Sequence, residues 1–355
     1  MPSFEEYCDE IHAMWDNRWL SNGGQKHKDF QKLLGERMNQ KNVFLYANGH
    51  VALEVGLDAL ELPKGGEVIT TPYTHCSTTH SIVRNGLKPV FCDINATDYC
   101  IDATKIEELI TPKTVAIMAT HVYGTMCDVE TIQRLAEKHN LKVIYDAAHA
   151  FGVTKDGKDV ASWGDMVMFS CHATKVFHTI EGGITVMRDD EVQQKLEMLV
   201  NFGFVNAESV RCISTNARMN EFECAMGICN LRHFEEEVSK RETAYRTYRE
   251  CLDGVDGIRF IADQAGITKN YSYMPVFFDG YKYDRNTVQK LLAENGIFAR
   301  KYFYPLVPDL EAYNTDFCGT DYPVAYHAAE TVLCLPMYAD LSADDVKRIC
   351  SIILK

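Results

Sequence analysis

The chain has 355 residues, of which 46% are hydrophobic and 24% are charged, and this length exceeds that of a usual single hydrophobic core. Its formal net charge of −14 argues against a nucleic-acid partner, because affinity for a phosphate backbone is built from clustered Lys and Arg. The composition excludes a disordered chain and predicts a globular protein with one large and one smaller domain.

Residues 50 to 190 alternate short β-rich runs with longer amphipathic segments. This alternation predicts an α/β domain with a mostly parallel sheet flanked by helices. The predicted helices cover residues 50–62, 75–85, 102–110 and 128–139, and the predicted strands cover residues 67–70, 89–93, 115–120, 142–146, 166–170 and 184–187. Ligands of such sheets bind outside the carboxyl ends of the strands, so polar residues that follow a strand are the first candidates for a site.

The pattern changes after residue 216. A long charged helix is predicted over residues 231–252, strands over 258–261 and 271–278, and helices over 284–294 and 342–354, with a strand-like run, IFARKYFYPL, at 297–306. We interpret residues 1–235 as the large domain and residues 236–355 as a smaller C-terminal α+β domain.

Two polar loops follow predicted strands in the large domain. KVIYDAAHAFG contains Asp146 and His149, and FSCHATKVFHTIEGG contains Ser170 and Lys175. A lysine amine can form a Schiff base with an aldehyde, and a carboxylate facing a pyridine nitrogen keeps that nitrogen protonated. Taken singly, Asp146 is more often a capping residue and Lys175 a solvated one. Together, at the same end of a sheet and between apolar strands, they favour a catalytic site.

These loops resemble those of the DegT-type sugar aminotransferases, a family with the aspartate-aminotransferase fold. That family has Asp-Ala-Ala followed by His or Gln, and then Ser-Phe-His-x-x-Lys-x-x-x-x-x-Glu-Gly-Gly, where this chain has DAAHAFG and SCHATKVFHTIEGG. The resemblance extends from WDNRWLSNGG to VLCLPMYADLSADDVKRIC. It implies fold type I of the transferases that depend on pyridoxal 5′-phosphate (PLP).

The resemblance assigns a role to four residues of the two loops. Lys175 would hold PLP as a Schiff base and move a proton between the substrate carbon and the cofactor. Asp146 would pair with the pyridinium nitrogen, and Ser170 would bind the phosphate. His149 would contact the 3-hydroxyl of the cofactor or the substrate, although a single His is about as often a core residue.

Two further segments supply candidates for the cofactor site. NGHVALEVGLDALEL places Asn48 and Gly49 in a turn and His50 at the first helical position, where free N–H groups attract a phosphate. The family usually has Thr where His50 stands, so we expect backbone amides to bind there. In TTPYTHCSTTH, His75 matches the position whose ring stacks on the cofactor, with an exposed residue at a helix start as the alternative.

The segment STNARMNEFECAMG resembles the Gly-Tyr-Asn-x-x-Met-x-Glu motif of the family, whose Asn reaches the phosphate of the neighbouring subunit. The matching residues are Asn216 and Glu221, and Thr215 replaces the usual Tyr. The resemblance implies a homodimer with shared active sites. The alternative is that Asn216 and Asn220 are turn and cap residues.

Substrate contacts are expected at both ends of the chain. Asn22 in WLSNGG, and Arg300 and Lys301 in RKYFYPL, occupy places where relatives bind the sugar nucleotide, the two cations being candidate diphosphate partners. The alternative for Arg300 and Lys301 is that they are simply residues of an exposed strand, where Lys and Arg are common.

Within the family, NGHVALE, ITTPYTH and HVYG resemble the dTDP-4-amino-4,6-dideoxyglucose transaminases. This implies transfer of an amino group from L-glutamate to C4 of dTDP-4-keto-6-deoxyglucose, with amination at C3 of a 3-keto sugar as one alternative. A non-catalytic regulatory or scaffold protein is another, although it would not need Lys175, Asp146 and Ser170 in one pocket. Dehydratase relatives have His in place of the lysine, and a nicotinamide enzyme would show G-x-G-x-x-G after a strand.

The thirteen cysteines include no C-x-x-C pair, and the closest two are Cys224 and Cys229. This spacing favours free buried thiols over a zinc or disulfide framework. The N-terminal stretch is acidic, and no apolar run reaches the roughly 18 residues of a membrane span. We therefore expect a cytoplasmic protein with no metal site and no membrane segment.

Overall fold

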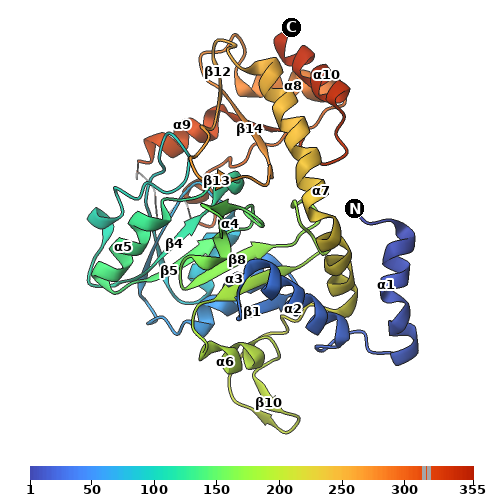
Figure 1. Cartoon of the computed structure of the whole chain (residues 1–355). Coiled ribbons are helices and arrows are strands. Elements are labelled where there is room, and N and C mark those ends of the chain that lie inside the picture. The colour runs from blue at the N-terminus through green and yellow to red at the C-terminus, as the bar shows by residue number, and fades with distance from the viewer. Residues whose placement is uncertain (314–316, 318–320) are drawn as a thin grey trace.

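The computed structural model describes residues 1–313, 317 and 321–355 (Figure 1). Its centre is a seven-stranded sheet in the order β1-β9-β8-β5-β4-β2-β3. The bounds are β1 Val43–Tyr46, β2 Glu67–Thr70, β3 Lys88–Phe91, β4 Thr114–Thr120, β5 Lys142–Asp146, β8 Met166–Ser170 and β9 Gly183–Met187. Only β9 runs against its neighbours in this sheet, β1 and β8, so the predicted mostly parallel α/β sheet is confirmed.

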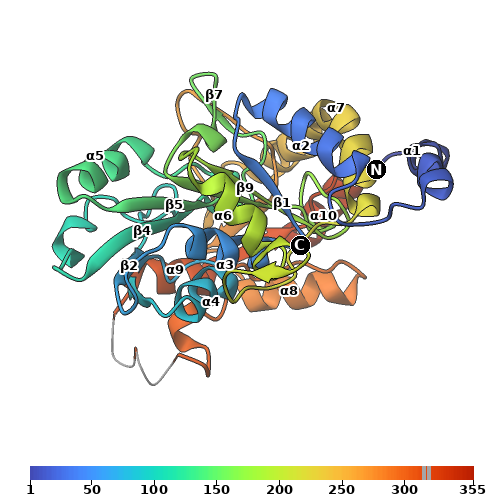
Figure 2. The same cartoon turned by 90° about the horizontal axis from the view of Figure 1, so that it is seen from below.

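Helices cover both faces of this sheet, which explains why the middle residues of β5 and β8 are apolar on both faces (Figure 2). In β5, Val143 and Tyr145 point into one core and Ile144 into the other, as the two-residue period of a strand requires. The first core includes residues of α2 (Gln25–Met38), α5 (Val129–His139) and α7 (Glu221–Leu252), and the second includes residues of α3 (Gly49–Ala59), α4 (Cys76–Arg84) and α6 (Val192–Leu199).

A third core joins the C-terminal elements to the second half of α7. It packs Tyr248 and Leu252 of α7 against an antiparallel sheet in the order β12-β14-β15. The elements of this core are β12 Ile258–Phe260, β14 Met274–Phe278, α8 Arg285–Glu294, β15 Val332–Leu335 and α10 Ala343–Leu354, whereas α9, Pro323–Thr331, packs into the first core. The expected division near residue 235 falls inside α7, and it stays a prediction.

Smaller elements complete the described part of the chain. They are α1 Phe4–Asn17, β6 Thr154–Lys155, β7 Lys158–Asp159, β10 Phe204–Asn206, β11 Ser209–Val210 and β13 Ile267–Thr268, with short 3-10 turns at Glu107–Leu109, Val122–Gly124, Val160–Ser162 and Val307–Asp309. No helix of the described residues is long and apolar enough to cross a membrane.

Several predicted elements need correction. The helix expected over 102–110 is only a 3-10 turn at Glu107–Leu109, because the segment is short and Pro112 disfavours helical backbone in the residue before it. The long helix starts at Glu221 rather than at 231, with Asn220 and Glu223 forming a capping box. The strand-like run 297–306 forms a single bridge, between Arg300 and Cys334.

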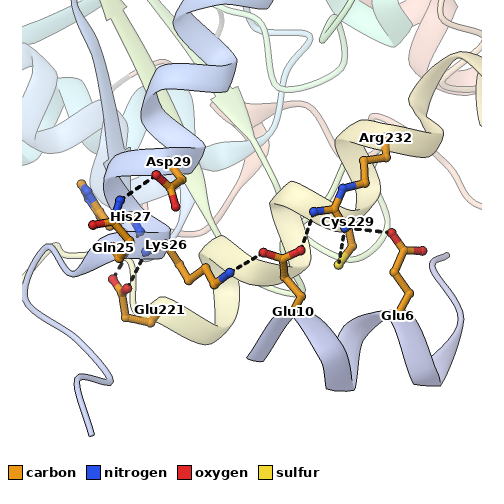
Figure 3. Close-up of polar contacts among 9 residues, drawn as sticks. All are labelled: Glu6, Glu10, Gln25, Lys26, His27, Asp29, Glu221, Cys229 and Arg232. Carbon is orange, nitrogen blue, oxygen red and sulfur yellow. Dashed lines mark hydrogen bonds and ion pairs between the residues drawn. The ribbon is translucent and has the colours of Figure 1, made fainter. Parts of the chain in front are cut away.

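Ion pairs and one buried carboxylate hold the N-terminal helices against α7 (Figure 3). Lys26 and Arg232 both contact Glu10 of α1 at 2.5 Å. Glu221 at the start of α7 is 2% exposed, and its carboxylate accepts hydrogen bonds from the N–H groups of Gly24 and Lys26 at 3.0 and 2.8 Å. A Cβ on Gly24 would lie 2.5 Å from Cδ1 of Trp19 and 2.6 Å from this carboxylate, so a larger residue there would force these side chains to shift. Glu221 therefore fixes the segment that enters α2.

Candidate active site

A cavity of about 300 Å³ opens where β4, β5 and β8 end in Thr120, Asp146 and Ser170. Its lining brings together most of the residues that the sequence indicated: Gly49, His50, His75, Asp146, His149, Ser170, Lys175 and Arg300. The site thus lies where parallel sheets place their ligands.

Asp146 is 3% exposed, and hydrogen bonds hold its carboxylate in place. Oδ2 accepts from the Thr78 hydroxyl at 2.7 Å, and Oδ1 accepts from the N–H of Ala148 at 3.0 Å. The Thr78 hydroxyl also contacts that of Thr74 at 2.8 Å. These hydrogen bonds hold the carboxylate in one orientation, in which it could pair with a buried cationic nitrogen.

Lys175 lies in a turn that follows β8. Its backbone N–H donates a hydrogen bond to the carbonyl of His172 at 2.9 Å, which closes the turn. Its Nζ donates a hydrogen bond to the Tyr273 hydroxyl at 3.3 Å. Burial lowers the pKa of Lys175 to about 8, although the negative charge of Asp146 opposes the shift. An amine with this pKa is partly neutral near neutral pH and can act as a nucleophile or a base.

The hydrogen bonds of His149 define its tautomer. Nδ1 accepts a hydrogen bond from the N–H of Tyr123 at 3.0 Å, so the proton of the neutral ring is on Nε2. Burial lowers the pKa of His149 well below its ordinary value, which keeps the ring neutral. In the cavity, His149 is therefore a hydrogen-bond donor through Nε2.

The start of α3 lies against Ser170. A Cβ on Gly49 would be 3.0 Å from the Cβ of Ser170, and one on Gly183 would be 2.5 Å from the carbonyl oxygen of Asn48. The Asn48 side chain accepts from the N–H of Val51 at 2.9 Å, and the N–H groups of the first helical residues have no partner within the helix. Backbone amides and a hydroxyl thus meet at one end of the cavity, as a phosphate site requires.

Two histidines of the cavity sit near helix starts. His50 is the second residue of α3, one position later than predicted, and its Nε2 lies 3.1 Å from the Glu54 carboxylate. His75 is the N-cap of α4, where its Nδ1 accepts from the N–H of Ser77 at 3.2 Å. His75 thus starts a helix, as the alternative expected, and it also lines the cavity, while the stacking of its ring on a cofactor stays a prediction.

Three expected site residues do not line this cavity. Asn22 is an exposed residue of the loop between α1 and α2. Lys301 places its Nζ 5.7 Å from the Tyr304 ring centroid, whereas the neighbouring Arg300 does line the cavity. Asn216 is exposed, and its side chain accepts from Nε of Arg218 at 3.1 Å. Their expected roles stay predictions.

The sequence did not single out several lining or supporting residues. Thr78 stands one helical turn after His75, and this spacing could have indicated that both face the same side. Tyr273, Tyr302 and Phe303 come from the C-terminal part of the chain and line the cavity opposite the sheet. Tyr302 and Phe303 belong to RKYFYPL, where substrate contacts were expected, whereas nothing in the pattern around Tyr273 points to the cavity.

Comparisons with known proteins identify the family of the chain. The model of the DegT/DnrJ/EryC1/StrS aminotransferase family matches residues 3–354. The chain is 41% identical over 354 residues to the dTDP-4-amino-4,6-dideoxy-D-glucose transaminase of Shigella dysenteriae, covering 99% of this chain and 96% of that one. It is 38% identical over 360 residues to the Escherichia coli protein of the same name, covering 100% and 96%.

Solved structures show the same fold. DesI, crystallised in the presence of its TDP-sugar product, superposes with a TM-score of 0.92 at 29% identity, covering 99% of this chain and 90% of that one. Helicobacter pylori PseC, an aminotransferase of pseudaminic acid biosynthesis, gives 0.93 at 25% identity, covering 98% and 95%. The chain therefore belongs to the DegT/DnrJ/EryC1/StrS aminotransferase family.

Proposed function

We propose that the protein is a PLP-dependent transaminase that moves an amino group from L-glutamate to C4 of dTDP-4-keto-6-deoxyglucose in the cytoplasm. The observation that carries the proposal is the meeting of the Lys175 amine, the Asp146 carboxylate and the start of α3 in one cavity. The names of the two relatives above support the choice of sugar.

The cavity residues fit PLP at each of its polar groups. Gly49, His50 and Ser170 would bind the phosphate, Asp146 would face the ring nitrogen, and His149 would donate from Nε2 to the 3-oxygen. When bound, PLP supplies an aldehyde that condenses with amines and a protonated ring that delocalises the electron pair of a broken C–H bond.

The side chains of the site would divide the proton transfers among them. Lys175, with a pKa of about 8, would take the proton from Cα of glutamate and, in the second half-reaction, deliver a proton to C4 of the sugar. Asp146, held by Thr78 and Ala148, would keep the ring nitrogen protonated throughout. His75 would pack its ring against the cofactor from the start of α4.

Arg300 is the candidate for binding the anionic parts of the substrates. It is exposed at the cavity, where its Nη1 donates to the Tyr302 hydroxyl at 2.6 Å. A guanidinium suits both a diphosphate and the carboxylate of glutamate. Asn22 and Lys301 would take part only at the outer end of a long sugar nucleotide.

We also propose a homodimer in which Asn216 reaches the cofactor phosphate of the partner subunit. Asn216 is exposed in its own chain, and it follows the hairpin of β10 and β11. Around this hairpin Phe202, Val210 and Ile213 are 44%, 58% and 98% exposed, and large apolar side chains are commonly covered in an interface.

The test uses the purified protein with PLP, L-glutamate and dTDP-4-keto-6-deoxyglucose, and NMR of the product locates the new amine. We expect amination at C4, and no product from the Lys175→Ala variant. Amination only of the 3-keto isomer, or only of UDP- or GDP-linked sugars, would contradict the proposed substrate. A protein that never acquires the yellow colour of bound PLP would instead support the scaffold alternative.

A further inference from the structure

Tyr273 reaches the cavity from the C-terminal part of the chain. It lies directly before β14, and its hydroxyl is 3.3 Å from Nζ of Lys175. Among the side chains of the described residues, it is the one to which the Lys175 amine is hydrogen-bonded. The contact joins the group that would carry out the proton transfers to a segment on the far side of the cavity.

The position of Tyr273 is fixed from both sides along the chain. Before it, the Ser272 hydroxyl donates to the carbonyl of His149 at 2.6 Å. After it, Met274 pairs with Leu335 in the C-terminal sheet. The Tyr273 ring also packs against the His149 ring with 4.5 Å between their centroids. The hydroxyl is therefore held at one place relative to the loop of Asp146 and His149.

The chemistry of a phenol suits this partner of an amine. Burial raises the pKa of Tyr273 above its ordinary value, so the hydroxyl stays protonated. It can accept a hydrogen bond from an ammonium group and donate one to a neutral amine. A carboxylate in the same place could only accept hydrogen bonds, and it would stabilise only the charged form of the lysine.

We infer that Tyr273 is a positioning residue for Lys175, whose hydroxyl aims the amine into the cavity before and after each proton transfer. This inference rests on the proposed function, in which Lys175 binds PLP and moves the protons. It assigns the C-terminal part of the chain a role in the chemistry besides substrate binding.

The test compares Tyr273→Phe with Tyr271→Phe. Tyr271 stands two residues earlier, and its ring packs 5.3 Å from that of Tyr245, away from the cavity. Each variant loses one hydroxyl from the same segment and keeps the ring. Two readouts are taken on the holoenzyme: the exchange of the Cα hydrogen of L-glutamate with solvent deuterium, and the circular dichroism of the cofactor band.

We expect Tyr273→Phe to slow the exchange about tenfold with little change in the KM for glutamate, as expected when a catalytic group loses orientation. We also expect a weaker dichroic band, because the cofactor bound to Lys175 is held less rigidly. Tyr271→Phe should match the wild type in both. A Tyr273→Phe variant that matches the wild type in both readouts would overturn the inference, as would equal losses in the two variants.

The outcomes separate this inference from the proposed function. A wild-type protein that binds PLP but exchanges no glutamate hydrogen would count against the proposed function. The dichroic band of the two variants would still decide whether Tyr273 orients Lys175. Thermal unfolding of both variants shows whether a loss reflects the fold, since a purely structural role would lower Tm and leave exchange per folded molecule unchanged.

Discussion

The hydroxyl of Thr78 donates a 2.7 Å hydrogen bond to Oδ2 of Asp146, from the first turn of α4 to the end of β5. Both side chains are buried, at 0% and 3% exposure. A hydrogen bond to a charged group is worth about 1.5–3 kcal/mol, so its loss should be measurable. Thr78 therefore helps to fix the orientation of the carboxylate that would face the cofactor ring.

Replacement of Thr78 by Val should lower kcat by about tenfold or more, because the Asp146 carboxylate loses a hydrogen bond that holds it in place and would be less well oriented toward the ring nitrogen. The measurement is steady-state transamination together with the equilibrium affinity for PLP. Thr79→Val is the matched control, since the Thr79 hydroxyl is also buried but has no hydrogen-bond partner among the described residues. Equal losses in the two variants would show that Thr78 acts only through packing.

The lowered pKa of Lys175 predicts how the cofactor-free protein takes up PLP. Only the neutral amine attacks an aldehyde, so the uptake rate should rise with pH and level off above a midpoint of about 8. Stopped-flow absorbance between about pH 6 and 11.5 measures this rate. A midpoint near the ordinary lysine value of 10.5 would mean that burial does not tune this amine.

The sequence was sufficient to predict the part of the site that is formed by the ends of the strands and the loops that follow them. The strands ending in Asp146 and Ser170 have the predicted bounds, because each is a β-rich run followed at once by polar loop residues. Local pattern and tertiary structure agree there, so Lys175 and His149 also fall into the cavity as expected.

The opposite side of the site could not be predicted, because long-range contacts determine it. Residues 271–278 look like one strand, but β14 starts at Met274, and Tyr273 lies outside it. The Asn270 side chain donates to the carbonyls of His149 and Phe151 at 2.8 and 3.0 Å. These hydrogen bonds hold the residues just before Met274 against the loop that follows β5, so these residues do not extend strand β14. The first ten residues of α7 were not predicted to be helical. Most of them are buried, so they lack the polar face that marks an amphipathic helix in a sequence.

Subunit mixing tests the proposed contact of Asn216 with the partner subunit. Lys175→Ala and Asn216→Asp chains should each be inactive alone, the second because its carboxylate repels the phosphate. A mixed dimer carries both lesions in one site and neither in the other, so mixtures should regain activity. If mixed dimers form without regaining activity, while dimers of wild type and Lys175→Ala keep about half, the phosphate contact lies within one chain.

The assignment of the cofactor to Lys175 is the central claim, and reductive trapping tests it directly. Borohydride treatment of the PLP-loaded protein, followed by digestion and mass spectrometry, identifies the lysine that carries the cofactor. We expect the pyridoxyl group on Lys175, and no specific adduct in a Lys175→Ala variant that keeps the wild-type unfolding temperature. A pyridoxyl group on another lysine, or glutamate transamination by Lys175→Ala at near the wild-type rate, would contradict the account.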